Sequence, residues 1–285
     1  MNQNNKRKIS RAEEEEIERM YCEMLETDLN IPLDEIIPPP PVALSYGKHT
    51  YTTSKGVFEA ETPICTYGNF SFIQAPPKTF KSYFVALLAS TYLKSQNRWV
   101  GDKGKSHREG REVMHFDTEQ GKWHCQRAFR RVSEMAEETE GYHTYSLRTI
   151  GYKDRMRFID HKLKTNTNLG LVIIDGIADL VSDVNNIEEA NSCIQRLMEW
   201  SANYNLHIIT VIHSNWGSEK PTGHLGSFCE KKTETQISLE RDEDSNVTTA
   251  KCKRSRNMGF EDIQFFINRY GFPEVIDATL PDTPF

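Results

Sequence analysis

The stretch that decides the fold runs from residue 70 to residue 88 and reads FSFIQAPPKTFKSYFVALL. Its apolar start, Phe70–Gln74, predicts a buried β-strand, since aromatic and β-branched residues favour strands. A turn with two prolines follows, and the apolar segment from Ser82 to Leu93 predicts a helix. A strand, a tight turn and a helix that starts with Lys-Ser provide the setting of a phosphate-binding loop.

Such a loop normally reads Gly-x-x-x-x-Gly-Lys-Ser/Thr. Backbone N–H groups and a helix N-terminus attract the phosphates, the lysine adds a positive charge, and the hydroxyl binds Mg²⁺. Lys81 and Ser82 supply the last two, whereas Ala75 and Phe80 stand at the glycine positions. Phe80 is the more serious departure because a Cβ restricts the backbone. An ordinary strand–turn–helix is the alternative. The candidate nucleotide-binding residues are Ala75, Pro76, Pro77, Lys78, Thr79, Phe80, Lys81, Ser82 and Tyr83.

A second apolar strand, Leu171–Asp175, ends in a carboxylate. In an α/β sheet an aspartate at this end of a strand faces the ligand crevice, where it can hold Mg²⁺ or a water that bridges to the metal. Many strands end in an aspartate without such a role, but here the strand follows Lys81 at a spacing that suits a Walker-type nucleotide site. We therefore expect Ser82 and Asp175 to form the magnesium site.

The rest of the chain alternates short apolar runs with amphipathic segments. Strands are expected at residues 113–117, 142–149, 171–175 and 207–213, and helices at 121–137, 153–164 and 187–204. This alternation predicts a parallel sheet with helices on both faces. Three further strands, at 236–241, 247–254 and 264–267, predict an antiparallel meander that closes one side of the sheet.

The N-terminal fifth has a different composition. Residues 11–25 carry a run of four glutamates and an apolar stripe at helical spacing, and Pro38–Pro41 predicts a stiff, extended connector. Two interpretations stay open: a tethered helix that docks on a neighbour, such as another copy of the chain, or a solvated tail. We expect an N-terminal helix and linker at 1–50, an ATPase domain at 51–272 and a tail at 273–285.

Composition limits the class of protein. The chain has 285 residues, 37% of them hydrophobic, and a net charge of −6, so it is no generally basic nucleic-acid binder. Six cysteines without a CxxC pair predict free buried thiols in a reducing compartment. No apolar window is long enough to span a bilayer and no signal peptide is evident. We expect a cytoplasmic protein with no membrane partner.

Three later motifs follow strands or lie on them. They are Asp117-Thr-Glu119, then His213 with the Gly- and Ser-rich stretch at 214–232, and finally Arg254 with Arg256. Each has a plain alternative: a carboxylate that caps the next helix, a structural histidine and a solvated strand edge. Loops are expected at 101–111 and 214–232 and are the candidate DNA contacts, and the first also fits a solvated insertion.

The order and spacing of these motifs over residues 60–272 resemble those of RecA/DnaB-like P-loop ATPases, especially RepA-type hexameric helicases and related ATPases of mobile elements. The resemblance implies that Glu119 polarises the attacking water and that His213 contacts the γ-phosphate. It also implies that Arg254 and Arg256 reach the γ-phosphate of a neighbouring subunit. Lys81, Glu119, His213, Arg254 and Arg256 are thus the candidate catalytic residues.

The function expected on this basis is an oligomeric motor or loader that binds and hydrolyses ATP with Mg²⁺. It would form a ring, such as a hexamer, or a filament, and act on DNA, with single strands favoured, in replication, recombination or mobile-element maintenance. The alternative is a nucleotide-binding switch or scaffold with weak or no hydrolysis, because both loop glycines are missing. A small-molecule kinase fits poorly, since the C-terminal meander carries a basic strand and no lid is evident.

Overall fold

The computed structural model describes residues 10–95, 97–214 and 220–276, and it divides into two compact units, Met1–Pro39 and Pro40–Phe285. The first unit contains the helix α1 (Arg11–Leu29), which confirms the N-terminal helix. α1 starts with a capping box, in which Ser10 Oγ accepts from the Glu13 N–H and the Glu13 carboxylate accepts from the Ser10 N–H. Its apolar stripe is more than half exposed at Ile17, Met20 and Met24.

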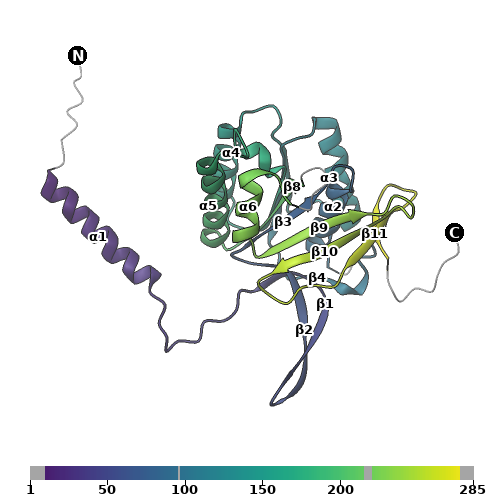
Figure 1. Cartoon of the computed structure of the whole chain (residues 1–285), viewed down its shortest axis with the longest axis horizontal. Coiled ribbons are helices and arrows are strands. Elements are labelled where there is room, and N and C mark those ends of the chain that lie inside the picture. Colours follow the sequence, from purple (N-terminus) through teal and green to yellow (C-terminus); the bar gives the residue numbers. More distant parts are fainter. Residues whose placement is uncertain (1–9, 96, 215–219, 277–285) are drawn as a thin grey trace. The chain divides into compact units, whose positions relative to one another are not determined.

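The second unit is built on a nine-stranded sheet (Figure 1). Its strands are β3 (Phe70–Ala75), β5 (Glu112–Asp117), β6 (Tyr142–Ser146), β7 (Leu169–Asp175), β8 (His207–His213), β9 (Thr235–Arg241), β10 (Val247–Ser255), β11 (Ile263–Ile267) and β12 (Pro273–Val275). Their order is β12-β11-β10-β9-β3-β8-β7-β5-β6. Strands β9 to β6 in this order pair in parallel, and β9 to β12 pair antiparallel. The parallel core and the meander are therefore confirmed, and β12 adds a strand beyond residue 272.

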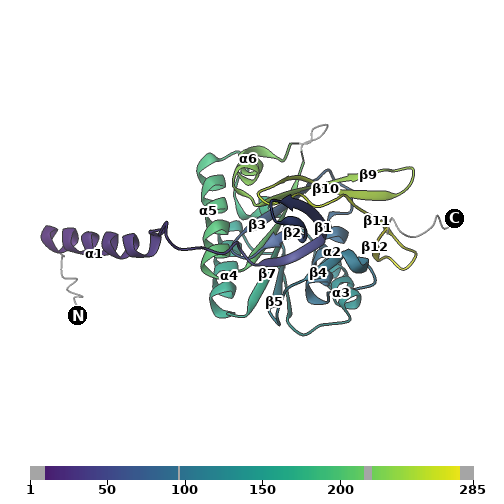
Figure 2. The ribbon, with the colours of Figure 1, turned by 90° about the horizontal axis from the view of Figure 1, so that it is seen from below.

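Helices cover both faces of this sheet, as predicted (Figures 1 and 2). They are α2 (Lys81–Leu93), α3 (Lys122–Ala136), α4 (Tyr152–Thr165), α5 (Ile187–Asn203) and α6 (Gly223–Lys232), with short 3-10 turns η1 (Gly101–Lys103) and η2 (Ile177–Leu180). α2 and α3 pack on one face, and α4, α5 and α6 on the other. In β7, Ile173 faces the first core and Val172 and Ile174 the second, which is the period-2 alternation of a strand.

A second, three-stranded antiparallel sheet was not predicted. It consists of β1 (Val42–Thr53), β2 (Gly56–Thr66) and β4 (Gly104–Ser106), in the order β2-β1-β4. β1 starts before residue 51, where the ATPase domain was expected to begin. Segment 101–111 is not a simple loop, because it contains η1 and β4, and Ser106 pairs with Leu44 of β1. A strand of three residues without a large apolar side chain leaves no readable period in the sequence.

The prediction of a continuous loop at 214–232 was wrong. Residues 215–219 lie outside the described residues, and α6 occupies 223–232. α6 buries Leu225 and Cys229, one turn apart, and Gly226 lets the helix approach Pro221, since a Cβ there would lie 2.7 Å from Pro221. Gly226 therefore reflects close packing within α6 and not a loop.

Four of the six cysteines are buried, but Cys22 is exposed and Cys252 half-buried, so the expectation of uniformly buried thiols was wrong for these two. Within the described ranges, no helix combines the length and the apolar character needed to cross a membrane.

Candidate nucleotide-binding site

The site lies where the carboxyl ends of four parallel strands meet, which is the usual ligand crevice of an α/β sheet. The phosphate loop follows β3, and Asp175 and His213 are the last residues of β7 and β8. Glu119 lies two residues after the end of β5. Strand register brings these ends together, because Ala75 pairs with His213 and Asp117 with Asp175.

The backbone of the phosphate loop is left-handed at two residues that are not glycine. Lys78 has φ 66° and Phe80 has φ 61°, and Phe80 is the N-cap of α2. The phenylalanine thus adopts the conformation that a glycine would allow without strain, at a cost of about 1–2 kcal/mol per residue. The Thr79 hydroxyl donates to the Pro76 carbonyl at 2.8 Å, which ties the loop across its turn.

Lys81 and Ser82, the first two residues of α2, turn toward the loop and toward β7. Lys81 Nζ donates to the carbonyl oxygens of Pro76 at 2.8 Å and Ala75 at 3.3 Å. Burial lowers the pKa of this ammonium group. Ser82 Oγ donates to Asp175 Oδ2 at 3.2 Å, so the two predicted magnesium ligands lie in contact.

Three carboxylates gather behind these residues. Burial, together with the charges of Asp117 and Glu119, raises the pKa of Asp175 to about 7. Asp117 accepts the N–H groups of Glu119 at 3.0 Å and Gln120 at 2.7 Å in the turn before α3. The N-cap of α3 is Gly121 and the helix has no side-chain cap, so the alternative that a carboxylate caps this helix was wrong. Glu119 is left to face the cavity, with its Oε1 3.4 Å from His213 Nε2. The hydrogen bond from His213 lowers the pKa of Glu119.

Thr118 and Gly176 fix this arrangement, and sequence reasoning did not identify either. The Thr118 hydroxyl lies 3.0 Å from the Asp175 carbonyl, 2.8 Å from that of Gly176 and 2.9 Å from Asp179 Oδ2. Gly176 has φ 105°, and a Cβ there would lie 2.2 Å from the Thr118 hydroxyl oxygen. The chain after Asp175 therefore approaches the Glu119 segment more closely than any side chain would permit.

A cavity of about 380 Å³ opens between the phosphate loop and α3. Of the predicted residues it is lined by Lys78, Thr79, Phe80, Lys81, Ser82, Tyr83, Glu119 and His213. His124, Arg127 and Arg131 of α3 also line it and were missed. Their i, i+3, i+7 spacing on a helix that starts just after Glu119 was a signal that could have found them. The Arg131 guanidinium lies 3.8 Å from the ring centroid of Tyr83.

Comparison with known proteins identifies the family of the chain. A family profile described as an AAA domain matches residues 63–219, more than half of the chain. The chain belongs to this AAA domain family. No curated protein matches it in sequence.

Solved structures show the same fold as this AAA domain. The RadB recombinase is 16% identical, with a TM-score of 0.51 over 74% of this chain and 92% of its own. A KaiC-like protein from the hyperthermophilic archaeon Pyrococcus horikoshii OT3 is 13% identical, with a TM-score of 0.54 over 74% and 91% of the two chains. The ATPase domain of G40P is 13% identical, with a TM-score of 0.53 over 73% and 85%. The domain is thus a RecA-like P-loop ATPase fold, as the resemblance predicted.

The two arginines predicted to act in trans do not line the cavity of their own AAA domain. Arg256 is engaged within the chain, because its Nη2 donates to the Lys232 carbonyl at 3.0 Å and its backbone N–H to Glu234. Arg254 is exposed, and its guanidinium has no hydrogen bond among the described residues. The two arginines are therefore not equivalent, since Arg256 is bonded within the chain and Arg254 is exposed.

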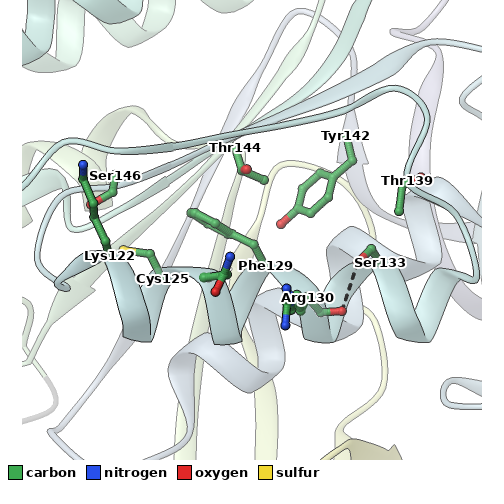
Figure 3. A pocket seen from close by; sticks show the side chains of 10 residues that line it. Lys122, Cys125, Phe129, Arg130, Ser133, Thr139, Tyr142, Thr144 and Ser146 are labelled. Atoms are coloured by element: carbon green, nitrogen blue, oxygen red, sulfur yellow. Dashed lines mark hydrogen bonds between the residues drawn. The ribbon is translucent and has the colours of Figure 1, made fainter.

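A separate groove of about 390 Å³ lies between α3 and β6, the last strand of the sheet (Figure 3). Phe129 and Tyr142 project between the helix and the strand. Behind them, buried His115 bonds through Nδ1 to the Tyr142 hydroxyl at 2.8 Å and packs edge-on against Phe129. α3 thus presents different residues to this groove and to the phosphate-loop cavity.

Proposed function

We propose that this protein hydrolyses ATP as a homo-oligomer that acts on DNA. The observation that carries the proposal is that Lys81, Ser82, Asp175, Glu119 and His213 converge at the ends of neighbouring strands beside one cavity. A lysine, a hydroxyl–carboxylate pair and a carboxylate free to hold water are the parts that phosphoryl transfer requires.

The residues fit a magnesium nucleotide. Ser82 Oγ and Asp175 Oδ2 lie 3.2 Å apart, so both oxygens can reach one small cation. Burial, together with the negative charges of Asp117 and Glu119, raises the pKa of Asp175, and a divalent cation would favour its ionised form. When bound, Mg²⁺ supplies charge neutralisation for the phosphate oxygens.

The side chains of the chain itself supply the remaining chemistry. Lys81 now donates to two loop carbonyls, and a phosphate oxygen would replace them as the acceptor. The lowered pKa of Glu119 keeps this carboxylate ionised near neutral pH, as a group that orients and deprotonates water must be. His213 lies beside Glu119 at the end of β8, which supports its proposed contact with the terminal phosphate.

Assembly is part of the proposal because neither Arg254 nor Arg256 lines the cavity of its own chain. Arg254 is exposed and Arg256 is bound to the end of α6, so we assign to Arg254 the contact with a neighbouring subunit's nucleotide. Positive charge delivered at this point is worth several orders of magnitude in rate in other P-loop enzymes. The exposed apolar stripe of α1 fits a tether that docks on another copy of the chain.

For DNA, the structural contacts favour one of the two candidate segments. In segment 101–111, Lys103 pairs with Glu261 at 2.8 Å and Lys105 with Glu61 at 3.1 Å, so these charges are largely compensated. α6 instead ends with Lys231 and Lys232, and both of these lysines are exposed. We therefore propose the 214–232 segment for backbone phosphate contacts, and one structural relative is a recombinase.

The test is steady-state ATPase activity with and without single-stranded DNA, for the wild type and two lysine variants. We expect Lys81→Ala to lose turnover by more than about 100-fold, since it removes the charge at the phosphates. Lys94→Ala, on the surface and ion-paired with Glu137, is the control and should keep wild-type turnover. Wild-type turnover no higher than that of Lys81→Ala would overturn hydrolysis. Nucleotide binding retained under those conditions would favour the switch.

A further inference from the structure

Resting on the proposed nucleotide site, we infer that Arg241 positions the phosphate loop and compensates for the glycine that is missing at residue 80. The loop has two left-handed residues that are not glycine, Lys78 and Phe80, and both contact this one guanidinium. Arg241 is the last residue of β9, outside every motif that the sequence suggested.

The contacts use different parts of the guanidinium. Its carbon lies 4.2 Å from the ring centroid of Phe80, within the range of a cation–π interaction. Its Nη1 donates to the Lys78 carbonyl at 3.2 Å. Its Nη2 donates to Asn246 Oδ1 at 2.6 Å, which anchors the arginine to the turn between β9 and β10. The β9–β10 hairpin therefore holds both unusual residues of the loop through one side chain.

The other side of the ring is also fixed. Phe80 and Tyr83 meet edge-to-face with centroids 5.3 Å apart, and the Arg131 guanidinium lies 3.8 Å over Tyr83. The Phe80 ring thus contacts both the β9–β10 hairpin and α2. A bulky residue keeps a left-handed backbone only when its surroundings enforce it.

The contacts of Arg241 should therefore affect nucleotide affinity, because they hold the loop in the conformation that binds. Glycine adopts the left-handed region freely, whereas Phe80 must be held there. Without Arg241 the loop would spend most of its time in other conformations, and the nucleotide would have to select the competent fraction. The apparent affinity for nucleotide is the intrinsic affinity multiplied by the competent fraction, so we expect R241A to bind about tenfold more weakly.

The experiment measures ADP binding by calorimetry for the wild type, R241A, R241K and the control R98A. Arg98 lies 4.3 Å over the Trp99 ring, so it forms a matched stack, and it does not line the cavity. R241A should bind about tenfold more weakly, R241K should recover part of the loss, and R98A should match the wild type. Wild-type affinity in R241A would overturn the inference.

Phe80→Gly separates positioning from a general structural role. In the F80G background residue 80 no longer needs enforcement, so adding R241A should weaken binding by clearly less than the factor of about ten expected in the wild type. An equal loss from R241A in both backgrounds would show a direct or structural effect and overturn the inference.

A nucleotide-free measurement keeps the inference separate from the proposed function. Lys78 is exposed, and trypsin should cleave after it faster in R241A than in the wild type or R98A, as followed by mass spectrometry. If the wild type binds no ADP but R241A is still cleaved faster than the wild type, the proposed function alone is refuted. An unchanged cleavage rate in R241A would refute the positioning role alone.

Discussion

Replacing Gly176 with alanine tests the close approach behind the magnesium aspartate. Gly176 has φ 105°, and an added Cβ would lie 2.2 Å from Thr118 Oγ1 and 3.0 Å from Glu119 Cγ. Something must shift, and the candidates are the hydroxyl that ties β5 to β7 and the proposed catalytic carboxylate. The substitution should therefore lower both stability and turnover.

The magnitude follows from three contributions. A left-handed backbone costs an alanine about 1–2 kcal/mol relative to glycine. Overpacking at the Thr118 contact costs about 1–3 kcal/mol. Moving the Thr118 hydroxyl away from its acceptors forfeits about 1 kcal/mol. We expect the free energy of unfolding to fall by about 4 kcal/mol, which is a large share of the total for a domain.

Gly110→Ala is the matched control. Gly110 also has a positive φ, of 80°, but a Cβ there would meet nothing within 4 Å, so only the backbone cost of about 1–2 kcal/mol applies. Urea denaturation of both variants at the same pH measures the difference, which we expect to exceed about 2 kcal/mol. Equal losses in the two variants, within about 0.5 kcal/mol, would refute the reasoning from the Thr118 contact.

Three further predictions concern other parts of the domain. Glu119→Gln should keep nucleotide affinity while turnover falls about 100-fold or more in a steady-state assay; unchanged turnover would exclude Glu119 as the base. Burial lowers the pKa of His115 to about 3, so unfolded chains take up a proton below pH 6.5 that the folded state refuses. Stability should thus fall by up to about 1.4 kcal/mol per unit as pH drops from 6.5 toward 3, and His115→Gln should flatten this slope in urea melts; an equal slope in the variant would contradict the assignment. Arg254→Ala should lose turnover at an unchanged melting temperature, whereas Arg256→Ala should lower stability by about 1 kcal/mol through the bond to Lys232; a reversed pattern would exchange their roles.

The centre of the main sheet could be predicted because four of its parallel strands are apolar runs buried on both faces. The runs that end at Ala75, Asp117, Asp175 and His213 are all of this kind, and turns and amphipathic helices separate them. The β1–β2 hairpin escaped detection because its outer half is exposed on both sides and carries no alternation. α6 escaped because small residues that permit close packing read as loop residues when seen in sequence alone.

The site residues Lys81, Ser82, Glu119, Asp175 and His213 could be predicted from their order along the chain, since parallel strands bring their carboxyl ends together. The backbone at Phe80 could not be predicted, because it is left-handed against the preference of its residue type. The contact that stabilises it comes from Arg241, far along the chain in the meander. Long-range contacts of this kind leave no local pattern.

The position of β3 at the centre of the sheet has a consequence for biosynthesis. β3 carries the phosphate loop, yet its neighbours β8 and β9 leave the ribosome long after it. The bond from the Thr66 backbone, just before β3, to the buried Glu234 carboxylate joins residues 168 apart in the chain. At ordinary translation rates that interval lasts on the order of ten seconds or more, during which the apolar strand has no partner. A nascent chain can therefore acquire a nucleotide pocket only near the end of synthesis, and until then Phe70 and Phe72 are surfaces for a chaperone to shield.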